Sequence, residues 1–118
     1  MPIDVHVHCK GGEDGNKILK AMDAVGLERI VLMSRPAYYS LETEAPDLVG
    51  HRVAIDELAK IVAPDPARMV GFAWIEPTLH DAVEMVDYAL GEKGLSGVKM
   101  LPNKWYPDDE RAQAVYSR

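Results

Sequence analysis

The sequence predicts an α/β fold in which β-strands and α-helices alternate along the chain. Segments at residues 3–8, 29–34, 69–75 and 97–101 have strand patterns, and a stretch with helical spacing follows each of them. Strict alternation implies parallel strands joined by right-handed crossovers. Two architectures satisfy this pattern: the first four βα units of a TIM-type (β/α)8 barrel, or a four-stranded doubly wound α/β sheet. Because a whole barrel needs about 250 residues, we expect residues 1–118 to form a single partial domain.

The first unit opens with the segment Ile3–His8, in which apolar and polar residues alternate. This alternation predicts a strand that places Asp4, His6 and His8 together on one face. A glycine-rich loop then ends the strand. We expect Asn16 to cap the helix that follows.

The later units are marked by apolar runs and by helix-capping residues. The run Arg29–Ser34 predicts a strand that is buried on both faces of a parallel sheet. The polar loop from Arg35 to about Gly50 is long for a βα connection, and loops of this length are often functional. Thr78 is expected to cap the third helix, with Asp81 at the capping-box position. The acidic run at residues 108–110 predicts the first turn of the last helix.

The composition argues against several classes of protein. Thirteen Lys and Arg residues against nineteen Asp and Glu residues give a formal charge of −6 and a pI near 5.1, which argues against a nucleic-acid partner. No apolar run approaches the roughly 20 residues of a membrane span, so no membrane partner is expected. The single cysteine, Cys9, excludes an internal disulfide. A chain without an internal disulfide and without an apolar signal segment at Met1 is predicted to be cytoplasmic.

The two histidines of the first strand carry the strongest chemical signal. Same-face neighbours on a strand lie about 6.6 Å apart. The imidazoles of His6 and His8 can therefore lean together and place nitrogens about 2.0–2.1 Å from one divalent cation, for which zinc is the expected ion. Asp4 could accept an N–H from a ligating imidazole and so orient it. The alternative is a pair of partly exposed histidines bonded to water or backbone, but the strand context favours metal binding.

Three motifs extend the prediction to a family. They are Ile3–His8, the segment GFAWIEP at residues 71–77, and the segment GVKMLP at residues 97–102, which is followed by YPDDER at residues 106–111. Together they resemble the amidohydrolase-related branch of the amidohydrolase superfamily of metal-dependent barrel enzymes. That branch includes decarboxylases similar to aminocarboxymuconate semialdehyde decarboxylase, as well as lactonases and hydratases that act on small carboxylated compounds. The resemblance implies the amino-terminal half of such a barrel.

The resemblance also implies roles for individual residues. His6 and His8 match the two family metal ligands of the first strand, whereas Leu101 stands where relatives often carry a histidine. The remaining family ligands come from later strands, which this chain does not contain. The implied reaction is hydrolysis of a small carboxylated, lactone or amide substrate by a metal-activated water, or a related non-oxidative decarboxylation. With two ligands and two unpaired sheet edges, the isolated chain is expected to bind metal weakly and to turn over little, and a homo-oligomer, such as a homodimer of half-barrels, could cover its edges.

Four other residues are candidates for substrate binding. Arg35 and Tyr38 follow the second strand, at the carboxyl end where barrel active sites gather, and could grip a substrate carboxylate. Glu76 lies at the corresponding end of the third strand and either points into the site or helps the next helix to begin. Lys99 is expected to bind a substrate anion or to have a structural role. A carbamylated Lys99 that bridges two metals is the less favoured alternative.

The remaining candidates have simpler explanations. His51 and His80 are expected to be surface histidines. Cys9 is expected to be an inert buried thiol, and Phe72 and Trp74 are expected in the core. The competing class of function is a non-enzymatic α/β module that binds a ligand or a partner at the carboxyl edge of its sheet.

Overall fold

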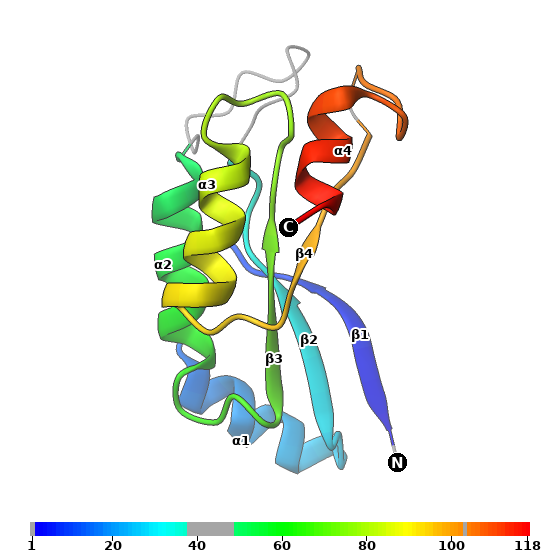
Figure 1. The fold of residues 1–118 in the computed structure, drawn as a ribbon. Coiled ribbons are helices and arrows are strands. Elements are labelled where there is room, and N and C mark those ends of the chain that lie inside the picture. The colour runs from blue at the N-terminus through cyan, green and yellow to red at the C-terminus, as the bar shows by residue number, and fades with distance from the viewer. Residues whose placement is uncertain (1, 38–48, 103) are drawn as a thin grey trace.

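A computed structural model of the chain describes residues 2–37, 49–102 and 104–118, and it contains the four predicted βα units (Figure 1). Four parallel strands form one sheet: β1 (Ile3–His8), β2 (Arg29–Met33), β3 (Met69–Trp74) and β4 (Gly97–Lys99). Each strand is followed by a helix: α1 (Gly15–Val25), α2 (His51–Val62), α3 (Ala82–Asp87) continued by the π-helix η1 (Tyr88–Glu92), and α4 (Glu110–Tyr116). The second, third and fourth strands end one or two residues earlier than predicted.

The strand order decides between the two predicted architectures. The sheet has the order β1-β2-β3-β4, whereas a doubly wound sheet requires the order to reverse at a switch point. Right-handed crossovers that always add the next strand on the same side place the connecting helices on one face of the sheet. Figure 1 shows α2 and α3 together on one side of β3. The doubly wound alternative is therefore wrong, and the barrel-type arrangement is confirmed.

The sheet is strongly curved, as a barrel segment must be. Side chains of β1 and β4 meet on its concave face, although two strands separate them: Lys99 Nζ lies 3.1 Å from His6 Nε2. Residues of β3 alternate between the two faces, with Met69 and Ala73 fully buried toward the helices. Phe72 and Trp74 were expected in the core, but they lie on the concave face and are only half-buried. In the described chain no helix layer covers that face.

The hydrophobic core fills the space between the sheet and its helices. Most of its buried side chains come from β2, β3, α2 and α3: Ile30, Leu32, Ile55, Leu58, Ile61, Val62, Met69, Ala73, Ala82, Met85 and Val86.

No helix within the described ranges combines the length and the apolar character needed to cross a membrane.

A bulge in β1 changes the predicted face of Asp4. Asp4 is in register with Ile30 and His8 with Met33, so four steps along β1 match only three along β2. Residues three apart on a strand point to opposite faces. Asp4 therefore does not share the face of His8, and its carboxylate instead accepts the backbone N–H of His6 at 3.1 Å. The shared face predicted for Asp4 was wrong because simple alternation cannot reveal a bulge.

Two of the predicted helix caps differ from those in the structure. Helix α1 begins at Gly15, and its cap is Asp14 rather than Asn16, because the Asp14 carboxylate accepts the backbone N–H groups of Asn16 (2.9 Å) and Lys17 (3.4 Å). Thr78 does not cap α3, whose first residue is preceded by Asp81.

Candidate metal centre at the carboxyl ends of the strands

His6 and His8 bring their imidazoles together on the concave face, at the carboxyl end of β1. The two Nε2 atoms are 2.8 Å apart, and the ring centroids are 4.9 Å apart with the planes inclined at 49°. Two nitrogens that ligate one tetrahedral zinc at about 2.0–2.1 Å lie roughly 3.4 Å from each other. The rings would have to separate by only about half an ångström to admit the ion. The pair can thus supply two imidazole donors to one divalent cation.

Lys99 and Trp74 border this pair. The Lys99 ammonium lies 3.1 Å from His6 Nε2 and 5.2 Å from the centroid of the Trp74 ring, and the Trp74 and His8 rings are 5.3 Å apart. Because an ammonium can only donate, His6 Nε2 accepts this hydrogen bond and carries no proton. Burial, followed by the positive charge of Lys99 and the neighbouring His6, lowers the pKa of His8 from its ordinary value. A neutral imidazole is the form that binds a cation.

The ligand set around the pair is incomplete. In the part of the chain that the structure describes, no three His, Cys, Asp or Glu side chains are grouped so that they could hold a metal ion. Catalytic zinc usually takes three protein ligands and a water molecule. His6 and His8 therefore fit a divalent cation but account for only part of its coordination.

Arg35 is directed at a carboxylate of the chain itself. Its Nε donates to Glu57 Oε2 at 2.9 Å and its Nη2 to Glu57 Oε1 at 2.7 Å, so the side chain forms a bidentate pair with α2. Gly11 packs against this pair, since a Cβ there would lie 2.3 Å from Glu57 Oε2. The structure shows this guanidinium paired with Glu57, and binding of a substrate carboxylate by Arg35 stays a prediction. The other candidate of this loop, Tyr38, lies outside the described residues.

Glu76 is buried and organises the turn after β3. Its Oε1 accepts the Thr78 backbone N–H at 3.1 Å and the Thr78 hydroxyl at 2.8 Å. Of the two roles considered for Glu76, the structure shows the one that helps the chain turn toward the next helix.

The prediction that His51 is a surface residue was wrong. Only 1% of His51 is exposed, and its Nε2 accepts the backbone N–H of Glu76 at 2.9 Å while Nδ1 lies 2.8 Å from Asp81 Oδ1. Since a backbone N–H can only donate, Nε2 is unprotonated and Nδ1 donates to the carboxylate. His51 thus ties the start of α2 to the end of β3 and to the start of α3. His80, by contrast, is exposed as predicted.

Cys9 follows β1 directly and is buried, as predicted. Burial, followed by the negative charge of Glu13, raises the pKa of the Cys9 thiol to about 12. A thiol that stays protonated at neutral pH is a poor nucleophile and a poor metal ligand. Cys9 is therefore inert despite its place next to His8.

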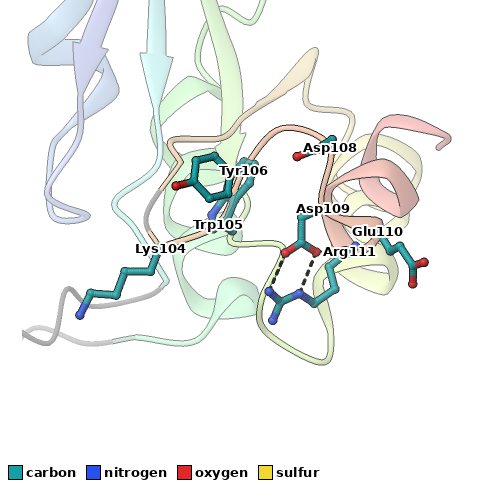
Figure 2. Close-up of a pocket in the computed structure, with 7 residues that line it drawn as sticks. All are labelled: Lys104, Trp105, Tyr106, Asp108, Asp109, Glu110 and Arg111. Atoms are coloured by element: carbon teal, nitrogen blue, oxygen red, sulfur yellow. Dashed lines mark hydrogen bonds and ion pairs between the residues drawn. The ribbon is translucent and has the colours of Figure 1, made fainter.

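A hollow of about 590 Å³ lies in the connection between β4 and α4, and Figure 2 shows the residues that line it. Sequence reasoning missed Trp105 there: only 5% of the residue is exposed, and its Nε1 has no hydrogen-bond partner among the described residues. Arg111 forms a bidentate pair with Asp109, at 2.9 and 2.7 Å, and so lowers the pKa of Asp109 to about 2. The residues that line the hollow are Lys104, Trp105, Tyr106, Asp108, Asp109, Glu110 and Arg111.

No protein-family model and no curated protein sequence matches this chain. Solved structures do match. One is 5-carboxyvanillate decarboxylase from Novosphingobium aromaticivorans with bound manganese and 3-methoxy-4-hydroxy-5-nitrobenzoic acid, at a TM-score of 0.69 and 21% identity over 91% of this chain and 31% of that chain.

Two further structures extend the comparison. An amidohydrolase II matches at a TM-score of 0.68 and 17% identity, over 99% of this chain and 46% of that chain. A probable 2-pyrone-4,6-dicarboxylic acid hydrolase from Acinetobacter baumannii with bound citric acid matches at a TM-score of 0.60 and 18% identity, over 98% and 46%. The chain thus spans between 31% and 46% of the length of these three proteins. It has the fold of four consecutive βα units of the barrels of these proteins.

Proposed function

We propose that this chain is the amino-terminal half of a metal-dependent hydrolase or carboxy-lyase of the amidohydrolase-related kind, with residues 1–118 as a single partial domain. The observation that carries the proposal is the convergence of the His6 and His8 Nε2 atoms to 2.8 Å at the carboxyl end of β1. Barrel enzymes assemble their active sites at this end of the sheet. The fold is shared with a manganese-containing decarboxylase and with a probable hydrolase, which supports this general kind of chemistry.

His6 and His8 would hold the divalent cation through their Nε2 atoms. Zinc suits imidazole donors, and the bound manganese of the similar decarboxylase makes manganese the second ion to test. When bound, such an ion lowers the pKa of a coordinated water toward about 7 and polarises a substrate oxygen. The depressed pKa of His8 keeps its imidazole available as a ligand.

Lys99 and Trp74 would form the adjoining substrate surface. The Lys99 ammonium, next to the histidines and 5.2 Å from the Trp74 ring, offers a positive charge to a carboxylate. Trp74 is half-buried and presents part of its indole on the concave face. A small carboxylated molecule fits this surface, either a lactone or amide that is hydrolysed or an acid that loses carbon dioxide. Because the ligand set within the described residues is partial, we expect the isolated chain to turn over little.

Metal analysis tests the proposal: each protein is loaded with zinc or manganese and then dialysed extensively against metal-free buffer. The parent chain should retain the ion, and His6→Ala and His8→Ala should each lose at least about tenfold in affinity, the size of effect expected when a ligand or its supporting group is lost. The exposed His80→Ala variant is the matched control and should bind as the parent does. If none of the four proteins retains an ion, the proposal fails and the non-enzymatic ligand-binding module becomes the better description.

A further inference from the structure

The Lys99 ammonium contacts two groups on the concave face of the sheet. Its Nζ lies 3.1 Å from His6 Nε2 and stands over the Trp74 ring, 5.2 Å from the ring centroid. A cation within about 6 Å of the centroid is attracted by the face of an indole. The ion pairs among the described residues do not include Lys99. The His6 lone pair and the Trp74 face are therefore the groups that hold this ammonium in the described chain.

The Trp74 ring is held in place from three strands. Trp74 is in register with Lys99 across β3 and β4, and paired residues of neighbouring parallel strands point to the same face. Its backbone N–H donates at 2.8 Å to the buried Oγ of Ser34, which directly follows β2. Its ring lies 5.3 Å from the His8 ring of β1, with the planes inclined at 53°. The indole is thus a fixed surface, whereas Lys99 carries its charge on a flexible four-carbon stem.

The His6 lone pair cannot serve Lys99 and a cation at the same time. A neutral imidazole has one nitrogen that accepts, and in His6 this nitrogen is Nε2. When a divalent cation takes this lone pair, the hydrogen bond from Lys99 is lost, and the two positive charges repel each other. The face of Trp74 is then the remaining contact, among the described residues, that keeps the ammonium next to the metal centre.

We propose that Trp74 is the positioning residue of Lys99: its indole face keeps the ammonium beside His6 and His8 while the cation is bound. This inference rests on the proposed function, because it names the residue that preserves the positive charge offered to a substrate carboxylate at that same site. A held ammonium leaves His6 less readily and repels the ion. Trp74 thus weakens metal binding and strengthens the binding of an anion.

Calorimetric titrations of the full 118-residue chain with zinc test the proposal through a double-mutant cycle. Trp74→Leu should bind zinc about two- to fivefold more tightly than the parent, because a cation–π contact of the strength found at exposed sites is lost. Lys99→Met should bind zinc about tenfold more tightly. The double variant should match Lys99→Met, since Trp74 then has no ammonium to hold. Trp74→Phe keeps an aromatic face and should stay within about twofold of the parent.

Proton NMR of the parent chain gives a second readout that needs no substitution. The ring current of an indole shifts protons above its face upfield, so the Hε resonances of Lys99 should lie upfield of those of the exposed Lys20. This upfield shift should persist when zinc is added. It should disappear in Trp74→Leu, whose side chain has no ring.

The outcomes separate this inference from the proposed function. If Trp74→Leu changes the zinc affinity equally with and without Lys99, or fails to tighten zinc binding in the parent background, the inference fails. It also fails if zinc moves the Lys99 resonances to the position of those of Lys20. In each of these cases zinc still binds through His6 and His8, so the proposed function stands, whereas both fail if none of the proteins binds zinc. Circular dichroism shows whether Trp74→Leu is folded; if it is not, the NMR comparison in the parent decides.

Discussion

His51 connects three elements through one buried ring. Its replacement by leucine should therefore lower the free energy of unfolding by more than the replacement of a surface histidine would. His51→Leu removes both ring nitrogens at similar volume. The Glu76 backbone N–H, which donates to His51 Nε2 at 2.9 Å, then stays buried without a partner, a loss of about 1–3 kcal/mol. Asp81 loses a 2.8 Å hydrogen bond, but its side chain is 29% exposed and can be rehydrated, so that loss adds about 1 kcal/mol.

The expected total is a decrease of about 2–4 kcal/mol in the free energy of unfolding, which is roughly 8–16 °C in Tm for a chain of this size. Urea unfolding followed by far-UV circular dichroism measures it, with His80→Leu as the control because His80 is exposed. The control should change stability by no more than about 0.5 kcal/mol. A change below 1 kcal/mol for His51→Leu would refute the argument that the His51 ring is a structural link.

Three more predictions follow from local geometry. Gly15→Ala should destabilise the chain by about 3 kcal/mol or more in thermal melts, because the new Cβ would lie 2.0 Å from a backbone carbonyl oxygen of α2. The control is Gly12→Ala, whose Cβ meets no atom within 4 Å and which should leave the stability unchanged. The pKa of Cys9 is raised to about 12, so the folded chain keeps this thiol protonated at pH values where the unfolded chain ionises. The free energy of unfolding should therefore not depend on Cys9 below about pH 9 and should fall between about pH 9 and 12. A thiol reagent at pH 8 should label only unfolded protein. Rapid labelling of the native chain would contradict the burial argument. Lys99→Met removes a positive charge roughly 5 Å from the expected cation. The repulsion between these two charges is about 1.5 kcal/mol in a water-like dielectric, so the variant should bind zinc about tenfold more tightly in a calorimetric titration. Unchanged or weaker binding, or an equal effect of the control Lys20→Met at an exposed position of α1, would count against the site.

The strands and the histidine pair could be predicted because the signals that specify them are local. The alternation in Ile3–His8 reflects a strand with two different faces, and residues two apart on such a strand share a face, where the His6 and His8 rings meet. Periodicity alone could not choose between a barrel and a doubly wound sheet, because that choice depends on which side of the sheet each new strand joins; the family resemblance favoured the barrel, and the strand order confirms it.

The parts that sequence reasoning missed depend on contacts between distant residues. The partner of Arg35 is Glu57, 22 positions away, and the partners of His51 lie 25 and 30 positions away in a different βα unit. Neither distance can be read from a periodic pattern, which describes one element at a time. The bulge that turns Asp4 away from His8 arises from the register between β1 and β2, and it leaves no mark on the alternation of apolar and polar residues.

X-ray absorption at the metal edge of the zinc-loaded chain tests the central claim most directly. The geometry predicts an inner shell with at least two imidazole nitrogens at about 2.0–2.1 Å, together with the outer-shell scattering of their rings. Both features should disappear in the His6→Ala, His8→Ala double variant. A shell of oxygen ligands alone in the parent chain, or an imidazole shell that survives in the double variant, would contradict the account.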